Sequence, residues 1–117
     1  MAVCALDLMS PIVFQVNPDT RVSLAWTSMR DHDVRHVCVT DSDGRLVGLA
    51  SDRDILVLGE GRAAGATALR EVMTREPITS TADVEAPDLA ELMLTEHLEA
   101  VPIIDAERRP IGIVTSS

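Results

Sequence analysis

The sequence carries one pattern twice, at a constant offset of 64 residues. Met9 aligns with Met73 and Gly48 with Gly112, and no gap is needed between them. The other identical pairs include Asp19 with Asp83, Met29 with Met93, Val37 with Val101, Asp41 with Asp105 and Arg45 with Arg109. A repeat of this length indicates two copies of one supersecondary unit. We expect the copies to pack about a pseudo-two-fold axis and to form paired clefts, where ligands bind.

Composition narrows the class of protein. The chain has 117 residues, 46% of them hydrophobic, which suits one compact domain. Its apolar runs are too short for a membrane span, and its N-terminus lacks the basic region of a signal peptide. The formal charge of −9 disfavours nucleic acid and anionic lipid as partners. The two scattered cysteines predict reduced thiols, and we therefore expect a cytoplasmic protein.

Residue patterns predict a strand, a helix and a hairpin in each half. In the first half we expect strands at 13–16, 37–39 and 46–50, a helix at 21–32 and a short helix at 52–58. Thr20 is the expected N-cap of the longer helix. The residues expected on its core face are Leu24, Ala25, Ser28 and Met29. Asp41-Ser42-Asp43-Gly44 is a strong hairpin signal between the second and third strands.

The second half is predicted to follow the same plan after a flexible connector at 59–65. Its expected elements are helices at 67–73 and 87–97 and strands at 78–81, 101–104 and 111–115. The turn at 105–110 is expected to replace the tighter turn of the first half. The short helix at 52–58, the last element of the first half, has no counterpart in the second half before Ser117. We therefore expect either a piece of a longer protein or a face that a neighbouring subunit covers.

The duplicated series of motifs resembles the CBS (cystathionine β-synthase) domain family in its tandem pair, the Bateman module. The matching segments are Asp7-Leu8-Met9-Ser10 with Glu71-Val72-Met73-Thr74, Val37 to Asp41 with Val101 to Asp105, and Gly48 to Ser51 with Gly112 to Thr115. The resemblance implies a mixed α/β (α+β) fold of β-α-β-β-α repeats packed sheet to sheet with pseudo-two-fold symmetry. The first repeat would span residues 1–60, the connector 61–70 and the second repeat 71–117.

The resemblance also implies a ligand site in the cleft between the repeats. Members of the family usually bind AMP, ADP, ATP or S-adenosylmethionine, and the family's ribose signature matches Gly48-Leu49-Ala50-Ser51-Asp52-Arg53-Asp54. A carboxylate such as Asp54 accepts hydrogen bonds from a vicinal diol beside the Ser51 hydroxyl. Arg53 is a candidate for a phosphate contact. By analogy, the adenine would lie against Val13, Phe14, Val37 and Cys38.

The matching site of the second repeat is expected to be impaired. Thr115, Ile78 and Pro102 are its candidate residues, but the acid due three residues after Thr115 falls beyond Ser117. Asp54 also has a structural interpretation, since acids are favoured in the first turn of a helix. No catalytic arrangement of residues stands out, and His32, His36 and His97 lack metal-ligand spacing. We therefore expect neither an enzyme nor a required cofactor.

Two functions remain open from the sequence. The first is a regulatory module that senses an adenine nucleotide or S-adenosylmethionine and acts on an attached or separate effector protein. The alternative is a dimerising, structural module without a ligand, because pairs of this family often associate into dimers. Trp26 lies off the predicted core stripe, and either contact with another subunit or partial burial in the same fold would explain it.

Overall fold

The computed structural model describes residues 2–12, 14–58 and 66–116. The chain forms two compact units whose bounds differ from those of the sequence repeats. Unit 1 contains residues Met1–Ile12 and Pro77–Ser117, and unit 2 contains Val13–Glu76. The first residues of each repeat therefore belong to the unit built mainly from the other repeat. We call residues 2–12 the N-terminal arm and residues 66–76 the central arm.

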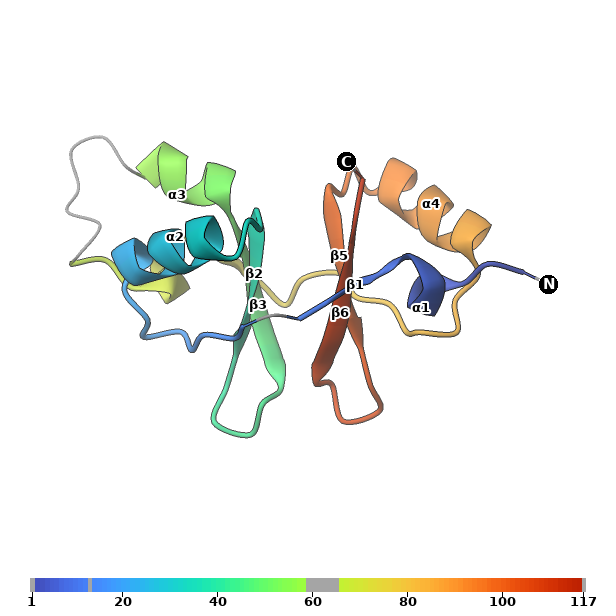
Figure 1. Ribbon diagram of the computed structural model, residues 1–117, viewed down its shortest axis with the longest axis horizontal. Helices are drawn as coiled ribbons and strands as arrows, with labels where there is room; N and C mark the ends of the chain where they lie inside the picture. Colours follow the sequence, from blue (N-terminus) through green and yellow to red (C-terminus); the bar gives the residue numbers. More distant parts are fainter. Residues whose placement is uncertain (1, 13, 59–65, 117) are drawn as a thin grey trace. The chain divides into compact units, whose positions relative to one another are not determined.

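Unit 2 is a three-stranded antiparallel sheet with helices on one face (Figure 1). Strands β2 (His36–Thr40) and β3 (Leu46–Ser51) form the hairpin, and β4 (Thr74–Arg75), from the central arm, pairs with β3. Helices α2 (Val22–Asp31) and α3 (Asp52–Leu58) pack against each other, and a 3-10 turn, η1 (Leu69–Glu71), belongs to the central arm. The core of this unit is formed by Val22, Ala25, Met29, Val37, Val39, Ala50, Ile55 and Leu69.

Unit 1 repeats this arrangement. Its sheet has the order β1 (Ser10–Pro11), β6 (Pro110–Thr115) and β5 (Ala100–Ile104), all antiparallel. The remaining helices are α1 (Ala5–Leu8), in the N-terminal arm, and α4 (Ala86–Thr95). The core is formed by Ala5, Leu89, Val101, Ile103 and Val114. The expectation of a mixed α/β fold with two small sheets and helices is therefore confirmed.

Each arm seats a methionine on a glycine of the hairpin that it joins. A Cβ atom added to Gly48 would overlap the Met73 Sδ atom, and one added to Gly112 would overlap Met9 Sδ. Gly48 pairs with Arg75 across the β3–β4 ladder, and Gly112 pairs with Pro11 across β6–β1. The close approach of a methionine side chain to the sheet therefore favours glycine at both positions, and at Gly112 the Ser10 carbonyl oxygen would also lie 3.0 Å from the added Cβ.

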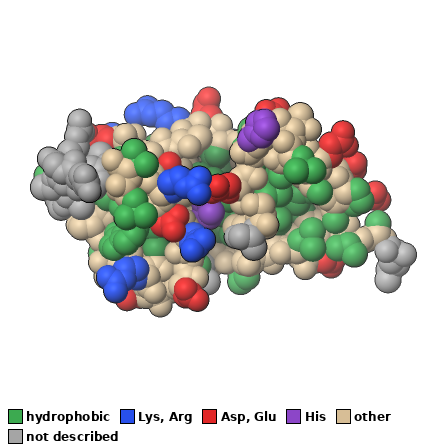
Figure 2. Space-filling view, turned by 90° about the horizontal axis from the view of Figure 1, so that it is seen from above, with side chains coloured by type: hydrophobic (Ala, Val, Ile, Leu, Met, Phe, Trp, Pro, Cys, Tyr) green, Lys and Arg blue, Asp and Glu red, His purple; other side chains and the backbone are tan. Residues whose placement is uncertain are grey.

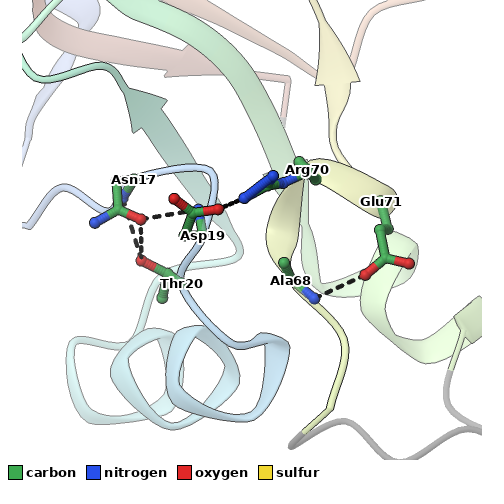
Figure 3. A network of polar contacts seen from close by, with 6 residues as sticks. All are labelled: Asn17, Asp19, Thr20, Ala68, Arg70 and Glu71. Carbon is green, nitrogen blue, oxygen red and sulfur yellow. Dashed lines mark hydrogen bonds and ion pairs between the residues drawn. The ribbon is translucent and has the colours of Figure 1, made fainter.

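Polar contacts attach the central arm to the loop before α2 (Figure 3). Arg70 forms an ion pair with Asp19, and the Leu69 amide donates to the Thr20 carbonyl at 2.9 Å. The Ala68 amide donates to Glu71 Oε2 at 3.0 Å, as the Cys4 amide does to Asp7 Oδ2 in the N-terminal arm. These bonds satisfy amides that the short turns would otherwise leave without partners.

Several expected elements are shorter than the sequence pattern predicts. Among the described residues of 13–16, only Val16 joins the sheet, through a single parallel bridge to Val39. The expected strand at 78–81 is likewise reduced to a bridge between Ser80 and Ile103. The expected helix at 67–73 is only the 3-10 turn of the central arm. The sequence thus predicted strands at 13–16 and 78–81, where the described backbone pairs at one position only.

The start of α2 also differs from the prediction. Its N-cap is Arg21, and the Thr20 hydroxyl instead closes a turn with Asn17, whose amide donates to Thr20 Oγ1 at 3.2 Å. Leu24, expected in the core, is 60% exposed, whereas Val22 takes a buried position. Trp26 is half-buried against the core of unit 2, which confirms the interpretation as partial burial.

The two hairpin turns have the same geometry, so the turn at 105–110 is not looser. Asp41 Oδ1 accepts the amides of Asp43 and Arg45 at 2.9 and 3.0 Å. Asp105 Oδ1 accepts the amides two and four residues later at 2.9 and 2.8 Å. Arg108 takes the positive φ of 64° that Gly44 takes at 80°.

Candidate functional site

The strongest candidate site lies in unit 2, where β3 ends at Ser51 and α3 begins at Asp52. Ser51 and Asp54 form two reciprocal hydrogen bonds. The Ser51 amide donates to Asp54 Oδ2 at 2.9 Å, and the Asp54 amide donates to Ser51 Oγ at 3.1 Å. This is the arrangement of a helix capping box, and both side chains are half-buried. The capping interpretation of Asp54 is therefore correct, and it fixes both side chains in place.

Capping does not exhaust the hydrogen-bonding capacity of the pair. A carboxylate has two oxygens with about four acceptor positions, and a hydroxyl that accepts one bond keeps a proton to donate. The junction also presents the amides of a helix start, which favour negative charge. Chemically, the junction can accept hydrogen bonds from a diol and attract an anion beside it.

Arg35 is a cation at this junction that sequence reasoning missed. Its carbonyl accepts the Asp52 amide at 2.9 Å, and its Nε lies 3.8 Å from Asp52 Oδ2. His36, the next residue, pairs with Ser51 across the β2–β3 ladder. The β2–β3 register thus brings Arg35 to the site, and a single sequence gives no signal for this register. Arg53, the cation predicted from the sequence, is exposed, and its amide donates to Asp52 Oδ1 at 2.8 Å.

The apolar residues predicted for the adenine have different environments. Val37 is 2% exposed and packs inside the core of unit 2. Phe14 is half-buried at the edge of that core, with its ring 4.8 Å from the His32 ring. Val13 lies outside the described residues. The structure therefore gives Val37 a packing role, and Phe14 offers more accessible surface.

Cys38 is buried on β2 between two core residues, with 3% of its surface exposed. Burial raises the pKa of the Cys38 thiol to about 12, because the thiolate is poorly solvated there. The thiol is therefore protonated and unreactive at neutral pH. It can serve only as a small apolar surface.

The candidates from the second repeat lie in unit 1. Thr115 ends β6 and is exposed, in the position that corresponds to Ser51. The Ser116 amide donates to the Glu99 carbonyl at 2.9 Å, as the Asp52 amide does to Arg35. Pro102 is fully buried in β5, whereas Ile78 is 39% exposed. The backbone hydrogen bond at the strand end is thus the same in both units, but unit 1 has Glu99 at the position that Arg35 occupies in unit 2.

No group of three or more metal-ligating side chains occurs among the described residues. In the same part of the chain, no helix has the length and apolar character needed to cross a bilayer. The fold and the site together define a class of tandem-repeat α/β protein with a capped strand–helix junction in unit 2.

The chain belongs to the CBS domain family. The family model for the CBS domain matches residues 5–60 and 69–117. A CBS domain-containing protein from Dictyostelium discoideum is 30% identical over 128 residues, covering all of this chain and 88% of the relative. The inosine-5′-monophosphate dehydrogenase of Methanocaldococcus jannaschii is 32% identical over 103 residues. That match covers 88% of this chain but only 20% of the enzyme.

A similar solved structure is the CBS domain pair of protein MJ0100. It has a TM-score of 0.88 and 27% sequence identity, and the match covers 99% of this chain and 91% of that one. That protein was crystallised in complex with 5′-methylthioadenosine and S-adenosyl-L-methionine. The resemblance to CBS domain pairs found in the sequence is therefore confirmed.

Proposed function

We propose that this chain is a regulatory module that binds an adenosine-containing small molecule, with the ribose held by Ser51 and Asp54. The observation that carries the proposal is the reciprocal pair of hydrogen bonds at 2.9 and 3.1 Å. It holds a carboxylate and a hydroxyl side by side before any ligand arrives, which lowers the ordering cost of binding. The ligands of the MJ0100 pair, both adenosine derivatives, support this chemistry.

The proposed ligand class includes AMP, ADP, ATP and S-adenosylmethionine. Asp54 would accept from the ribose diol, and Arg35 and Arg53 would attract a phosphate. Phe14 would contact the base, and Cys38, predicted by analogy for the same role, has only 3% of its surface exposed to meet it. No cofactor is required, and the chain would act by binding rather than by catalysis. Its two unpaired cysteines favour a reducing compartment such as the cytoplasm.

Regulation requires that the ligand prefer one of two states of the protein. We propose that occupancy biases an attached or separate effector protein. The match to the dehydrogenase relative covers only 20% of that enzyme, so in that relative the matching segment is part of a larger protein. An attached effector would be a further domain of the same kind of larger chain.

The first prediction separates ligand binding from helix capping. Asp54→Asn keeps an oxygen that can accept the Ser51 amide but removes the charge that a diol prefers. We expect it to weaken adenosine-ligand binding by about 1.5–3 kcal/mol, roughly 10- to 150-fold. Calorimetry with AMP, ATP, S-adenosylmethionine and the diol-free 2′,3′-dideoxyadenosine provides the measurement.

The matched control is Asp52→Asn, since Asp52 lies in the same helical turn but not in the Ser51 pair. With S-adenosylmethionine, which has no phosphate to meet Arg35, the Asp52→Asn variant should keep most of the affinity, and it should keep the discrimination against the dideoxynucleoside. Absence of binding by the unaltered protein at millimolar ligand would contradict the proposed function. Equal losses in both variants would contradict the role of Asp54.

We infer a second role, association of the chain into homodimers, from its exposed apolar side chains. Leu24, Leu56, Val57 and Leu94 all lie on helices, with 60%, 61%, 82% and 77% of their surfaces exposed. Exposed apolar groups of this size favour an interface. Sedimentation equilibrium over a concentration series tests association, and addition of nucleotide tests whether it depends on the ligand.

A further inference from the structure

Asp52 lies beside the candidate site and takes no part in the proposed ribose contacts. Two backbone hydrogen bonds hold it in place. Its amide donates to the Arg35 carbonyl at 2.9 Å, and its Oδ1 accepts the Arg53 amide at 2.8 Å. Its other oxygen, Oδ2, lies 3.8 Å from Arg35 Nε. The backbone bonds therefore place a carboxylate beside an arginine that would meet a phosphate.

Asp52 and Arg35 form an ion pair that is open to solvent. A separation of 3.8 Å is too long for a hydrogen bond, so the attraction is between charges only. The Arg35 side chain is 75% exposed and that of Asp52 is 36% exposed, and ion pairs in such surroundings are weak. An anion can therefore reach the Arg35 guanidinium, but it meets a cation whose charge Asp52 already offsets.

The second repeat shows that the fold does not need this ion pair. In unit 1, Glu99 stands at the position of Arg35. Ser116 stands at the position of Asp52. The Ser116 amide nevertheless donates to the Glu99 carbonyl at 2.9 Å, the same distance as in unit 2. Because the strand end forms its backbone bond without opposite charges, the ion pair in unit 2 is available for a role in binding.

The formal charges at the junction in unit 2 cancel. Asp52 and Asp54 carry two negative charges. Arg35 and Arg53 carry two positive charges. Unit 2 as a whole is also close to balance, with eight arginines and ten acidic residues, whereas unit 1 has two arginines and nine acidic residues. On the face shown in Figure 2, arginine side chains lie over unit 2 with acidic side chains beside them. The carboxylates thus offset the attraction of the arginines for a phosphate.

We propose that Asp52 is a specificity-determining residue, which limits how much a phosphate adds to the affinity of the site. Because it offsets the charge of Arg35, the site recognises the adenosine part of a ligand and responds weakly to the phosphate. The ligand class is then adenosine derivatives with and without phosphate, including a sulfonium such as S-adenosylmethionine. This inference rests on the proposed function and adds the residue that sets the phosphate preference.

AMP and adenosine are the probes, because they differ only in the phosphate. Calorimetry at pH 8, where the phosphate carries close to two negative charges, measures the ratio of their affinities. In the unaltered protein we expect AMP to bind less than about tenfold more tightly, below the roughly 10- to 150-fold of a charged hydrogen bond. Asp52→Asn removes the charge and keeps an oxygen that can accept the Arg53 amide. It should raise the ratio about two- to fivefold, the range of an exposed ion pair.

Two further variants show whether Asp52 acts through Arg35. In a chain that already carries Arg35→Gln, Asp52→Asn should no longer raise the ratio, because the cation that it releases is absent. Asp43→Asn is the matched control, since it removes the same charge from the turn at the opposite end of the same hairpin. It should leave the ratio as in the unaltered protein. Added salt should reduce the effect of Asp52→Asn, because salt screens exposed charges.

The outcomes distinguish this inference from the proposed function. If the unaltered protein binds none of adenosine, AMP and S-adenosylmethionine at millimolar concentration, both are overturned. If it binds them and Asp52→Asn leaves the ratio unchanged, the inference alone is overturned. The same holds if the unaltered protein prefers AMP by tenfold or more, if the rise persists beside Arg35→Gln, or if Asp43→Asn reproduces it. Circular dichroism of each variant confirms that the fold is intact.

Discussion

Gly48 illustrates how one residue serves two interpretations. In the sequence it begins the segment Gly48 to Asp54 that resembles a ribose signature. In the structure its missing side chain makes room for the Met73 thioether. Packing against Met73 is therefore enough to explain a glycine at this position. The groups of the candidate site that could bind a ligand are the side chains of Ser51 and Asp54.

At the same scale, the candidate site was partly predictable. Ser51 and Asp54 were predicted because they match the ribose signature of the family, whose residues lie close together in sequence, and their role in binding stays a prediction. Arg35 was missed because it reaches the site through the β2–β3 register, which a single sequence does not specify. Val37 was predicted to contact the adenine by analogy with the family, and its burial in the core could not be known from the analogy because that depends on which face of the strand packs inward.

Cys38 should make the stability of the protein depend on alkaline pH. Burial raises the pKa of its thiol from 9.0 to about 12. Below pH 9 the thiol is protonated in both folded and unfolded chains. Between pH 9 and 12 only the unfolded chain loses this proton, so the free energy of unfolding should fall by up to about 1.4 kcal/mol per pH unit. Urea unfolding across this range measures the slope.

The composition makes that slope easy to interpret. The chain contains no lysine and no tyrosine, whose side chains would otherwise titrate in the same range. Cys38→Ala should lower stability but flatten the slope, whereas Cys4→Ser should leave the slope in place. A slope that survives Cys38→Ala would rule out the buried thiol as its cause.

At the scale of helices and strands, the sequence patterns correctly predicted the elements that form through contacts between residues close in sequence. Helix α3 and the hairpin strands agree with the sequence prediction within one residue at each end. Strands β1 and β4 have two residues each, too few for a periodic signal, and each pairs with a strand distant in sequence. These strands form because the two arms run beside strands β6 and β3, and no sequence pattern within two residues predicts that pairing.

Both long helices end in the same way. Past α2, the Val34 amide donates to the Met29 carbonyl at 2.9 Å, and past α4 the Leu98 amide donates to the Met93 carbonyl at 2.9 Å. Asp33 and His97, just before these donors, adopt φ values of 54° and 56°. This is the Schellman arrangement, in which the left-handed residue is usually glycine. Neither helix has glycine there.

We therefore expect His97→Gly to stabilise the protein by about 0.5–1 kcal/mol, because it removes the steric cost of the left-handed conformation. Asp33→Gly should gain less, since aspartate tolerates that region better than histidine. The control Glu96→Gly changes a residue with a φ of −96° and should destabilise. Thermal unfolding followed by circular dichroism compares the three variants. Equal effects of His97→Gly and Glu96→Gly would argue against relief of strain.

At the scale of the whole molecule, the compact unit is not the unit that repeats in the sequence. The core of unit 2 includes Leu69, with Val72 and Met73 packed against it, all from the central arm. A fragment of residues 13–76 contains every residue of that core, whereas a fragment of residues 1–60 lacks the arm. We expect cooperative urea unfolding for residues 13–76 and none for residues 1–60, as measured by circular dichroism. Similar cooperativity in both fragments would show that the arm is dispensable.

The exchange of arms has a consequence for how such a chain can arise. Met9 rests on Gly112 and Met73 on Gly48, so each hairpin is completed by the opposite copy of the repeat. Two unlinked copies of a single ancestral repeat would contain every one of these contacts by trading arms with each other. Joining them into one gene would replace an encounter between molecules with a tether, and assembly would no longer depend on how much protein the cell makes.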